Sequence, residues 1–320
     1  MKGFVVLSIL VSAISGVSQA ADLYVNTNGS GIQCFESNPC SSIQAAVDYA
    51  SEGDMIHVAA GTYYENVSLG GPTAPNTKKG ITIRGAGDDE TFVISAGGKG
   101  QRPAGVPADI IFDIWSANVT IEKLSIEHPA TEVSKRDIGV FVGPPAINAT
   151  VQKTTIARNR IGSELEPWKP GSRGILVFRA VNSLIHKNDF EGNYEDHIHM
   201  PTSAATITKN DVKGATRLGI VIIQESEKSL STGSIVMKNE VEDSGSDGIQ
   251  IQGDNNLVVD NEVENSGGAG IKLCGITEVG DCVNPFDAWS EASGNVVSKN
   301  ELEDNAQSIV DNGSLNIVSE

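Results

Sequence analysis

The stretch YEDHIHM, residues 194–200, gathers side chains that can transfer protons or bind a metal ion. It holds two of the five histidines of the chain, His197 and His199, beside an acidic pair and a tyrosine. Histidine titrates near neutral pH and can act as a general base, for which tyrosine can be the partner acid. Two imidazoles two residues apart on one strand face can instead bind zinc or copper if a third ligand is present. The backbone that carries these residues decides between the two.

A repeat of about 22 residues predicts that backbone. Each copy has a short β-branched run, an asparagine and an acidic–apolar alternation, as in ATITKNDVKG and SIVMKNEVEDSG. A fixed period of this size is typical of a solenoid of stacked coils. We expect the asparagines to form one column with hydrogen-bonded amides, and to occupy left-handed bends. The central asparagines are Asn159, Asn188, Asn210, Asn239, Asn261 and Asn300.

A second series of strands between these blocks carries the candidate site. It reads DIGVFV, SRGILVF, EDHIHM, RLGIVII, SDGIQIQ and GAGIKLC, and His197 stands where the other copies have glycine. The residue after this position is β-branched in every copy and is Ile198 in this one. We expect it to point into the core. Strict strand alternation then predicts that His197 and His199 point outward on the same face.

Arginines on neighbouring coils flank the predicted histidine pair. Arginine holds a carboxylate through two parallel hydrogen bonds, so this face is predicted to bind an anionic polysaccharide containing uronic acid. The residues predicted to be catalytic are Tyr194, His197, His199 and Arg217. The residues predicted to bind substrate are Trp168, Arg173, Arg179, Gln224, Glu225, Gln250 and Lys272. No clear third ligand completes a metal site, although acid-rich turns such as EDSGSDG offer oxygen ligands to Ca²⁺ or form a solvated rim.

The beginning of the chain and its cysteines indicate a secreted or periplasmic protein. Residues 1–20 have the positive start, apolar core and small-residue cleavage site of a signal peptide, which leaves a mature domain over 21–320. No later apolar run reaches the ~20 residues of a membrane span. The four cysteines pair by proximity, and two local disulfides are expected in an oxidising compartment. The pairs are Cys34 with Cys40 and Cys274 with Cys282.

Charge and local pattern add three further expectations. The net charge of −18 argues against a nucleic-acid partner, because phosphate binding requires a basic surface. A helix is predicted over 41–52, with Ser41 or Ser42 as N-cap, and would cover the open end of the strand stack. Residues 270–292 are predicted to form an insertion pinned by the second disulfide.

Two resemblances refine this interpretation. SIQAAVDYASEGDMIHVAAGTYYENVSL, followed by KKGITIRGAG, resembles the first coils of right-handed parallel β-helix proteins of the pectate-lyase and pectin-methylesterase superfamily. It implies an all-β, single-domain, right-handed parallel β-helix with an N-terminal capping helix. The segment from YEDHIHM to GIVIIQ resembles the catalytic coils of mannuronan C5-epimerases, and Tyr194 and His199 match that pattern by offset. His197 stands at the family's aspartate position, and its Asp-Pro-His triplet is absent.

Two functions therefore stay open. The first is a carbohydrate-active enzyme, a lyase or C5-epimerase that removes the C5 proton of a uronate polysaccharide. Such a reaction requires a neutralised carboxylate and a base. The alternative is a non-catalytic β-helix: a surface, adhesin or glycan-binding protein.

Overall fold

The computed structural model describes residues 20–97, 100–101, 107–129, 137–144, 146–158, 171–201, 204–223, 233–275, 282 and 291–319. The predicted signal peptide, apart from residue 20, lies outside these ranges, and so does most of the predicted insertion at 270–292. Asn159, Trp168, Gln224 and Glu225 also lie outside the described residues.

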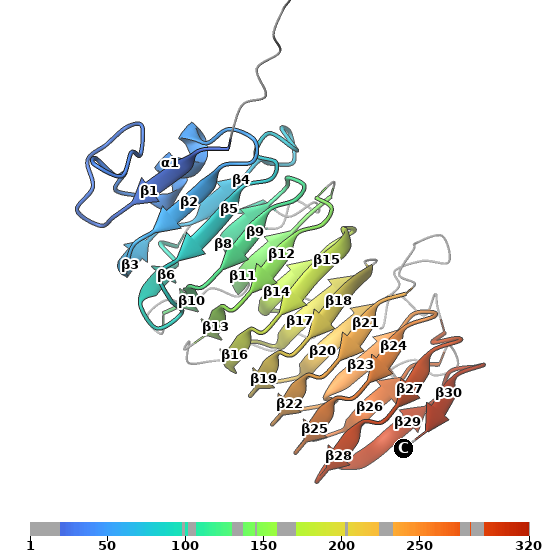
Figure 1. Ribbon diagram of the computed structural model, residues 1–320. Coiled ribbons are helices and arrows are strands. Elements are labelled where there is room, and N and C mark those ends of the chain that lie inside the picture. Colours follow the sequence, from blue (N-terminus) through green and yellow to red (C-terminus); the bar gives the residue numbers. More distant parts are fainter. Residues whose placement is uncertain are drawn as a thin grey trace, which may run out of the picture.

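The described strands form three parallel sheets that run the length of the molecule (Figure 1). From β9 onward each coil adds one strand to sheet 1, one to sheet 2 and one to sheet 3, in that order. Each strand therefore pairs with the equivalent strand of the next coil. The predicted parallel β-helix is confirmed.

Sheet 1 has 11 described strands. In spatial order they are β1 (Asp22–Val25), β2 (Met55–Val58), β5 (Thr82–Gly85), β9 (Thr120–Glu122), β12 (Thr150–Gln152), β15 (Val181–His186), β18 (Ala204–Thr208), β21 (Ile235–Met237), β24 (Leu257–Val259), β27 (Val296–Ser298) and β30 (Ile317–Ser319).

Sheet 2 has nine described strands. They are β3 (Gly61–Tyr64), β6 (Thr91–Ile94), β10 (Ser125–His128), β13 (Thr155–Arg158), β16 (Asp189–Gly192), β19 (Asp211–Lys213), β22 (Glu240–Glu242), β25 (Glu262–Glu264) and β28 (Glu301–Glu303).

Sheet 3 has ten described strands, one of which, β7 (Gly100–Gln101), pairs antiparallel with β8. The parallel strands are β4 (Val67–Leu69), β8 (Pro107–Ile114), β11 (Asp137–Val142), β14 (Arg173–Val177), β17 (Asp196–Pro201), β20 (Leu218–Ile223), β23 (Ile249–Gln252), β26 (Ala269–Leu273) and β29 (Gln307–Asp311).

Helix α1 (Ile43–Tyr49) is shorter than predicted and begins after Ser42. The Ser42 hydroxyl accepts a hydrogen bond from the amide of Ala45, and the Glu65 carboxylate accepts two more from the helix N-terminus. These side chains occupy the amides that a first helical turn leaves unpaired. Among the described residues, no helix is long and apolar enough to cross a membrane.

The predicted asparagine column is confirmed at the corner between sheets 1 and 2. Side-chain amides donate from coil to coil over 2.9–3.0 Å, from Asn188 through Asn210, Asn239 and Asn261 to Asn300. The predicted left-handed bend is wrong by one residue. It falls on the residue before each asparagine, as at Lys209, whose φ is 57°.

The middle strands of sheet 3, from β8 to β23, are buried on both faces almost throughout, unlike an amphipathic sheet with one solvent-exposed side. Its inward residues join the main core, which also receives the inward residues of sheets 1 and 2. Its outward residues form two further apolar clusters. One contains Ala108, Ile110, Trp115, Ile138, Phe141 and Leu176, and the other contains Leu218, Val221 and Ile223.

Both predicted disulfides are confirmed. Cys34 bonds to Cys40 next to β1, and Cys274, directly after β26, bonds to Cys282.

Candidate functional site

A charged cluster lies on the outer face of sheet 3 at β14, β17 and the start of β20. Asp196 is its centre and is fully buried. The Arg217 side chain donates to both of its carboxylate oxygens, over 2.9 and 2.7 Å, and Arg173 Nε lies 3.0 Å away. Both arginines also approach Glu195, at 3.4 and 3.1 Å. Burial opposes ionisation of Asp196, but the two arginines hold its pKa well below the usual range.

His199 belongs to this cluster and points outward, as predicted. Its Nδ1 lies 2.8 Å from Asp196 Oδ2, while Nε2 has no hydrogen-bond partner among the described residues. Burial, followed by the charge of Arg173, lowers the pKa of His199 to about 4, although Asp196 opposes the shift. The imidazole is therefore neutral at pH 7. Its Nδ1–H donates to Asp196 and its Nε2 lone pair is left for a proton or a metal ion.

The predicted outward orientation of His197 is wrong. His197 is fully buried against the rings of Phe190 and Tyr194, and its Nε2–H donates to the carbonyl of Lys213 over 2.9 Å. Burial lowers its pKa to about 4. The reason is a skipped position in the strand pairing: Asp196 pairs with Arg173 and Ile198 with Ile175, and strict alternation fails between them.

The glycines in the same column show what this skipped position requires. An added Cβ at Gly139 or Gly174 would lie within 3 Å of a core side chain and of the carbonyl of the next coil. The column therefore faces the inner corner of the coil between sheets 2 and 3. His197 fills this space, where the other copies leave it empty with glycine.

Tyr194 also lies inside the coil and not beside His199. It is fully buried, and its hydroxyl lies 2.9 Å from Nδ1 of His128. The four residues predicted to be catalytic are therefore separated into an inner pair, Tyr194 and His197, and an outer pair, His199 and Arg217.

The described residues among those predicted to bind substrate do not all lie at the charged cluster. Arg173 is part of the charged cluster. Arg179 lies in the exposed turn after β14, with its guanidinium 4.9 Å from the Phe178 ring centre. Gln250 and Lys272 occupy the outward column of His199, but Val221 separates them from it in the register.

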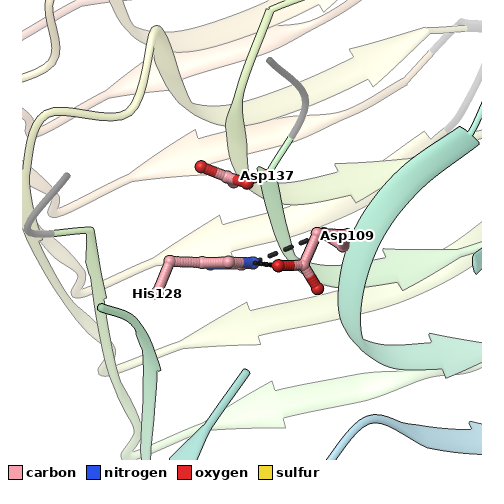
Figure 2. Close-up of side chains that lie close together, drawn as sticks. All are labelled: Asp109, His128 and Asp137. Atoms are coloured by element: carbon pink, nitrogen blue, oxygen red, sulfur yellow. Dashed lines mark hydrogen bonds and ion pairs between the residues drawn. The ribbon is translucent and has the colours of Figure 1, made fainter. Parts of the chain in front are cut away.

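A second cluster, which was not predicted, lies at the inner corner between sheets 2 and 3 (Figure 2). It consists of Asp109 in β8, His128 at the end of β10 and Asp137 at the start of β11. One ligand atom from each residue lies within 4.8 Å of the others, and all three side chains are buried. It is the one such group of three among the described residues.

Polar neighbours orient two members of this group. The Ser95 hydroxyl lies 2.7 and 2.6 Å from the two carboxylate oxygens of Asp109, and Asn66 donates to one of them over 3.0 Å. His128 contacts the Tyr194 hydroxyl through Nδ1, and its Nε2 lies 3.3 Å from the carbonyl oxygen of Asp109 and 3.8 Å from Asp109 Oδ2. A ring nitrogen held by a neighbour while the other faces carboxylates is typical of a metal-binding histidine.

The dimensions of the group approach those of a metal site. An ion about 2.1 Å from each ligand atom keeps those atoms within roughly 4.2 Å of one another. The His128–Asp109 distance of 3.8 Å already satisfies this limit, and the widest pair, at up to 4.8 Å, requires a closure of roughly half an ångström. The donor set of one imidazole and two carboxylates suits a divalent transition metal.

The sequence contains a signal for this group. Asp109 and Asp137 each precede isoleucine at the same register position, in ADIIFDI and DIGVFV, and pair directly in the sheet. The aligned repeats therefore place two carboxylates on adjacent coils. The end of the preceding sheet 2 strand then supplies His128.

Comparisons with solved structures show the handedness and class of the fold. The crystal structure of the Dettilon tailspike protein is 15% identical with a TM-score of 0.57, and the match covers 87% of this chain and 50% of the tailspike chain. A pectin methylesterase mutant in complex with a hexasaccharide is 11% identical with a TM-score of 0.56 and 93% coverage of both chains. Pectin methylesterase from carrot is 15% identical with a TM-score of 0.51, covering 93% of this chain and 88% of that one.

These neighbours are right-handed parallel β-helices, and two of them act on carbohydrate by name. At such low identity they show the fold alone. The chain spans half the length of the tailspike protein.

Sequence comparison gives a family. No curated protein sequence matches the chain. The family model described as periplasmic copper-binding protein (NosD) matches residues 115–318, which include His128 and Asp137 but not Asp109. Two disulfides and a periplasmic family agree with the predicted extracytoplasmic location. Because the match covers more than half of its length, the chain belongs to the NosD family.

Proposed function

We propose that this protein binds a copper(II) ion through Asp109, His128 and Asp137. The observation that carries the proposal is the convergence of three buried ligand atoms within 4.8 Å, contributed by three separate strands. The description of the family as copper-binding supports the choice of metal.

The donor atoms favour the oxidised ion. Carboxylate and imidazole ligands suit Cu²⁺, whereas Cu⁺ prefers the sulfur of cysteine and methionine. All four cysteines are in disulfides, which leaves no thiolate for a Cu⁺ site. Among first-row divalent ions, Cu²⁺ binds most tightly to a given site of this kind. The site would therefore take Cu²⁺ ahead of Zn²⁺ or Ni²⁺ at equal concentration.

The surrounding residues hold the ligands in place. Ser95 and Asn66 fix the Asp109 carboxylate, and the Tyr194 hydroxyl fixes the ring of His128. Partners of this kind raise metal affinity by orienting the ligand, and their loss typically lowers affinity about 10- to 100-fold. In this proposal Tyr194 is a positioning residue. A buried, closed donor set suits tight holding of an ion rather than chemistry on a large substrate.

Electron paramagnetic resonance of the protein loaded with one equivalent of Cu²⁺ tests this assignment. The expected spectrum is a single copper species with hyperfine coupling to one nitrogen, because one imidazole coordinates. Asp137→Asn and His128→Asn should remove that species, and Tyr194→Phe should weaken Cu²⁺ binding about 10-fold or more. Circular dichroism and thermal unfolding of the metal-free variants verify that each is folded.

Two matched controls make the test specific. His57→Ala removes the exposed His57–Asp22 pair, which has the same residue types at 2.8 Å on sheet 1. His199→Ala removes the imidazole of the charged cluster. Both variants should keep the spectrum of the wild type. A copper signal that survives Asp137→Asn and disappears with His199→Ala would place the ion at the charged cluster and refute the assignment.

A second candidate function rests on the pair formed by Asp196 and His199. It is the removal of the C5 proton of a uronate in an anionic polysaccharide, by a lyase or a C5-epimerase. His199 is neutral, held by Asp196 through Nδ1 and unpaired at Nε2 among the described residues, so Nε2 can accept a proton, although a pKa of about 4 makes it a weak base. Arg217, whose side chain is 24% exposed, lies beside it and could contact the substrate carboxylate.

The structure changes the mechanism expected for this function. Tyr194 is buried in the coil and is no partner acid for His199. Arg173 and Arg217 already contact Glu195 and Asp196, so the charges of the cluster cancel and attract an anionic polymer weakly. His199 would take the proton, and a lyase would then expel the neighbouring glycosidic oxygen. An epimerase would return a proton to the opposite face of the ring.

Incubation with alginate and polygalacturonate tests the second candidate. Ultraviolet absorbance of an unsaturated uronate identifies a lyase, and altered uronate NMR signals without cleavage identify an epimerase. His199→Ala should abolish either activity, whereas His57→Ala should leave it unchanged. Absence of turnover with both polymers, in protein that is folded, would leave a non-catalytic β-helix.

A further inference from the structure

A polar groove lies on the outer side of sheet 3, next to the charged cluster along the coil axis and several coils away from the group of Asp109, His128 and Asp137. Its volume is about 520 Å³, within the size range of small-molecule sites. β23, β26 and β29 form its floor, and Cys282 lies at its side, held by the disulfide to Cys274. The principal side chains that line it are Asp247, Gln250, Lys272, Gln307 and Val310.

Gln250 is the unusual residue of this groove. It is 1% exposed, yet neither its amide nitrogen nor its amide oxygen has a hydrogen-bond partner in the part of the chain that the structure describes. Its register places it between Val221 and Lys272 in the outward column, so its side chain points away from the main core and toward the groove. A buried amide with both ends unpaired is rare in folded proteins and requires an explanation. A ligand in the groove would supply both missing partners.

The lining residues restrict the chemistry of that ligand. The amide of Gln250 needs an acceptor and a donor close together, which adjacent hydroxyl groups provide. Among the described residues of the lining, the charged side chains are one lysine and one aspartate, whose charges balance. Gly267 and Gly268 form part of the wall.

From these features we infer that the groove binds an uncharged saccharide of one or two rings, anchored by Gln250. This site is separate from the copper site and from the charged cluster, and it is a site for holding a glycan without reaction. It also assigns Gln250 and Lys272 to a neutral sugar, in place of the uronate expected from the sequence.

Gln250→Leu is the decisive variant. Leucine has a similar size and no polar atoms, so it removes the unpaired amide without opening a large cavity. If Gln250 serves a ligand, the variant should lose saccharide binding while its Tm without ligand stays equal or rises. If Gln250 served only the fold, the same variant should unfold at a lower temperature.

Saturation-transfer NMR and calorimetry against a panel of sugars provide the measurement. The panel holds galactose, glucose and N-acetylglucosamine, their disaccharides, and galacturonate as the charged comparison. We expect at least one neutral sugar to bind, more tightly than galacturonate, and its Kd to rise at least 10-fold in Gln250→Leu. Gln152→Leu, the same exchange on sheet 1, should leave the Kd unchanged, and so should His128→Asn.

Three results would overturn the inference. The first is that no neutral sugar binds, which means that only water occupies the groove. The second is that wild type and Gln250→Leu have equal Kd values. The third is that galacturonate binds more tightly than every neutral sugar.

Discussion

The substitution Asn239→Ala tests most directly whether the asparagine column stabilises the solenoid, because Asn239 lies in the middle of the column. Its side chain takes part in four hydrogen bonds. Oδ1 accepts from the backbone and the side-chain amide of Asn210, over 3.0 and 2.9 Å. Nδ2 donates to the carbonyl of Ile207 and to Oδ1 of Asn261, over 3.0 and 2.9 Å. Asn239→Ala removes all four at a site that is 2% exposed.

The expected loss of unfolding free energy follows from that count. Each bond contributes about 1 kcal/mol net, and the buried donors of Asn210 would lose their acceptor, so the loss should be about 4 kcal/mol. Asn300→Ala should lose about 2 kcal/mol, because three bonds are removed at a partly buried position. Asn28→Ala, at an exposed position, should change the free energy by less than about 0.5 kcal/mol.

Urea unfolding followed by circular dichroism gives these free energies, and hydrogen exchange of the Asn210 amide locates the change. In the Asn239→Ala variant that amide should exchange faster than in the wild type, while amides of α1 should not change. A loss below about 1 kcal/mol, or a loss no larger than that of Asn28→Ala, would refute the reasoning that the column stabilises the stack.

Two further predictions concern pH. Burial raises the pKa of Asp113 to about 7, while the Trp115 indole N–H, which donates to it over 2.6 Å, opposes the shift. The contribution of Asp113 to stability is therefore fully present below about pH 4 and lost as the pH rises through 7. Asp113→Asn should be more stable than the wild type at pH 8. The Trp115 indole NMR signal should titrate near pH 7 in the wild type and not in the variant. Asp196 has the opposite sign, because its pKa is depressed in the folded state, so its contribution is present above about pH 4 and is lost on acidification. Asp196→Asn should lose about 3–5 kcal/mol at pH 7 in urea unfolding, and the difference from the wild type should narrow by pH 3; an equal difference at both pH values would contradict this assignment.

Much of the fold could be predicted because each sequence repeat corresponds to one coil of the helix. The asparagine column, both disulfides and the parallel stack depend on spacing in the sequence, and the structure confirms them. The bend beside the column was placed one residue late. A lysine such as Lys209 adopts the left-handed conformation there, because the asparagine side chain is required for the ladder.

The site was harder to predict, for two physical reasons. Several outward positions of sheet 3 are apolar, as at Phe141 and Val221, so hydrophobicity alone does not distinguish its two faces. Alternation also fails where the strand pairing skips a residue, and this reversed His197 while His199 was placed correctly. The group of Asp109, His128 and Asp137 has no contiguous motif, because the coil brings together residues from three strands.

The asparagine column also gives the assembly of the stack a direction. The backbone N–H of Asn188 finds its acceptor on Asn210, that of Asn210 on Asn239, and that of Asn239 on Asn261. Each of these three asparagines thus depends on the coil that follows it in the chain for the acceptor of its backbone N–H. In the folded stack, this corner of a coil therefore has its backbone hydrogen bond only when the next coil is in place. The growing C-terminal edge would be the least protected part of the molecule until each new coil docks.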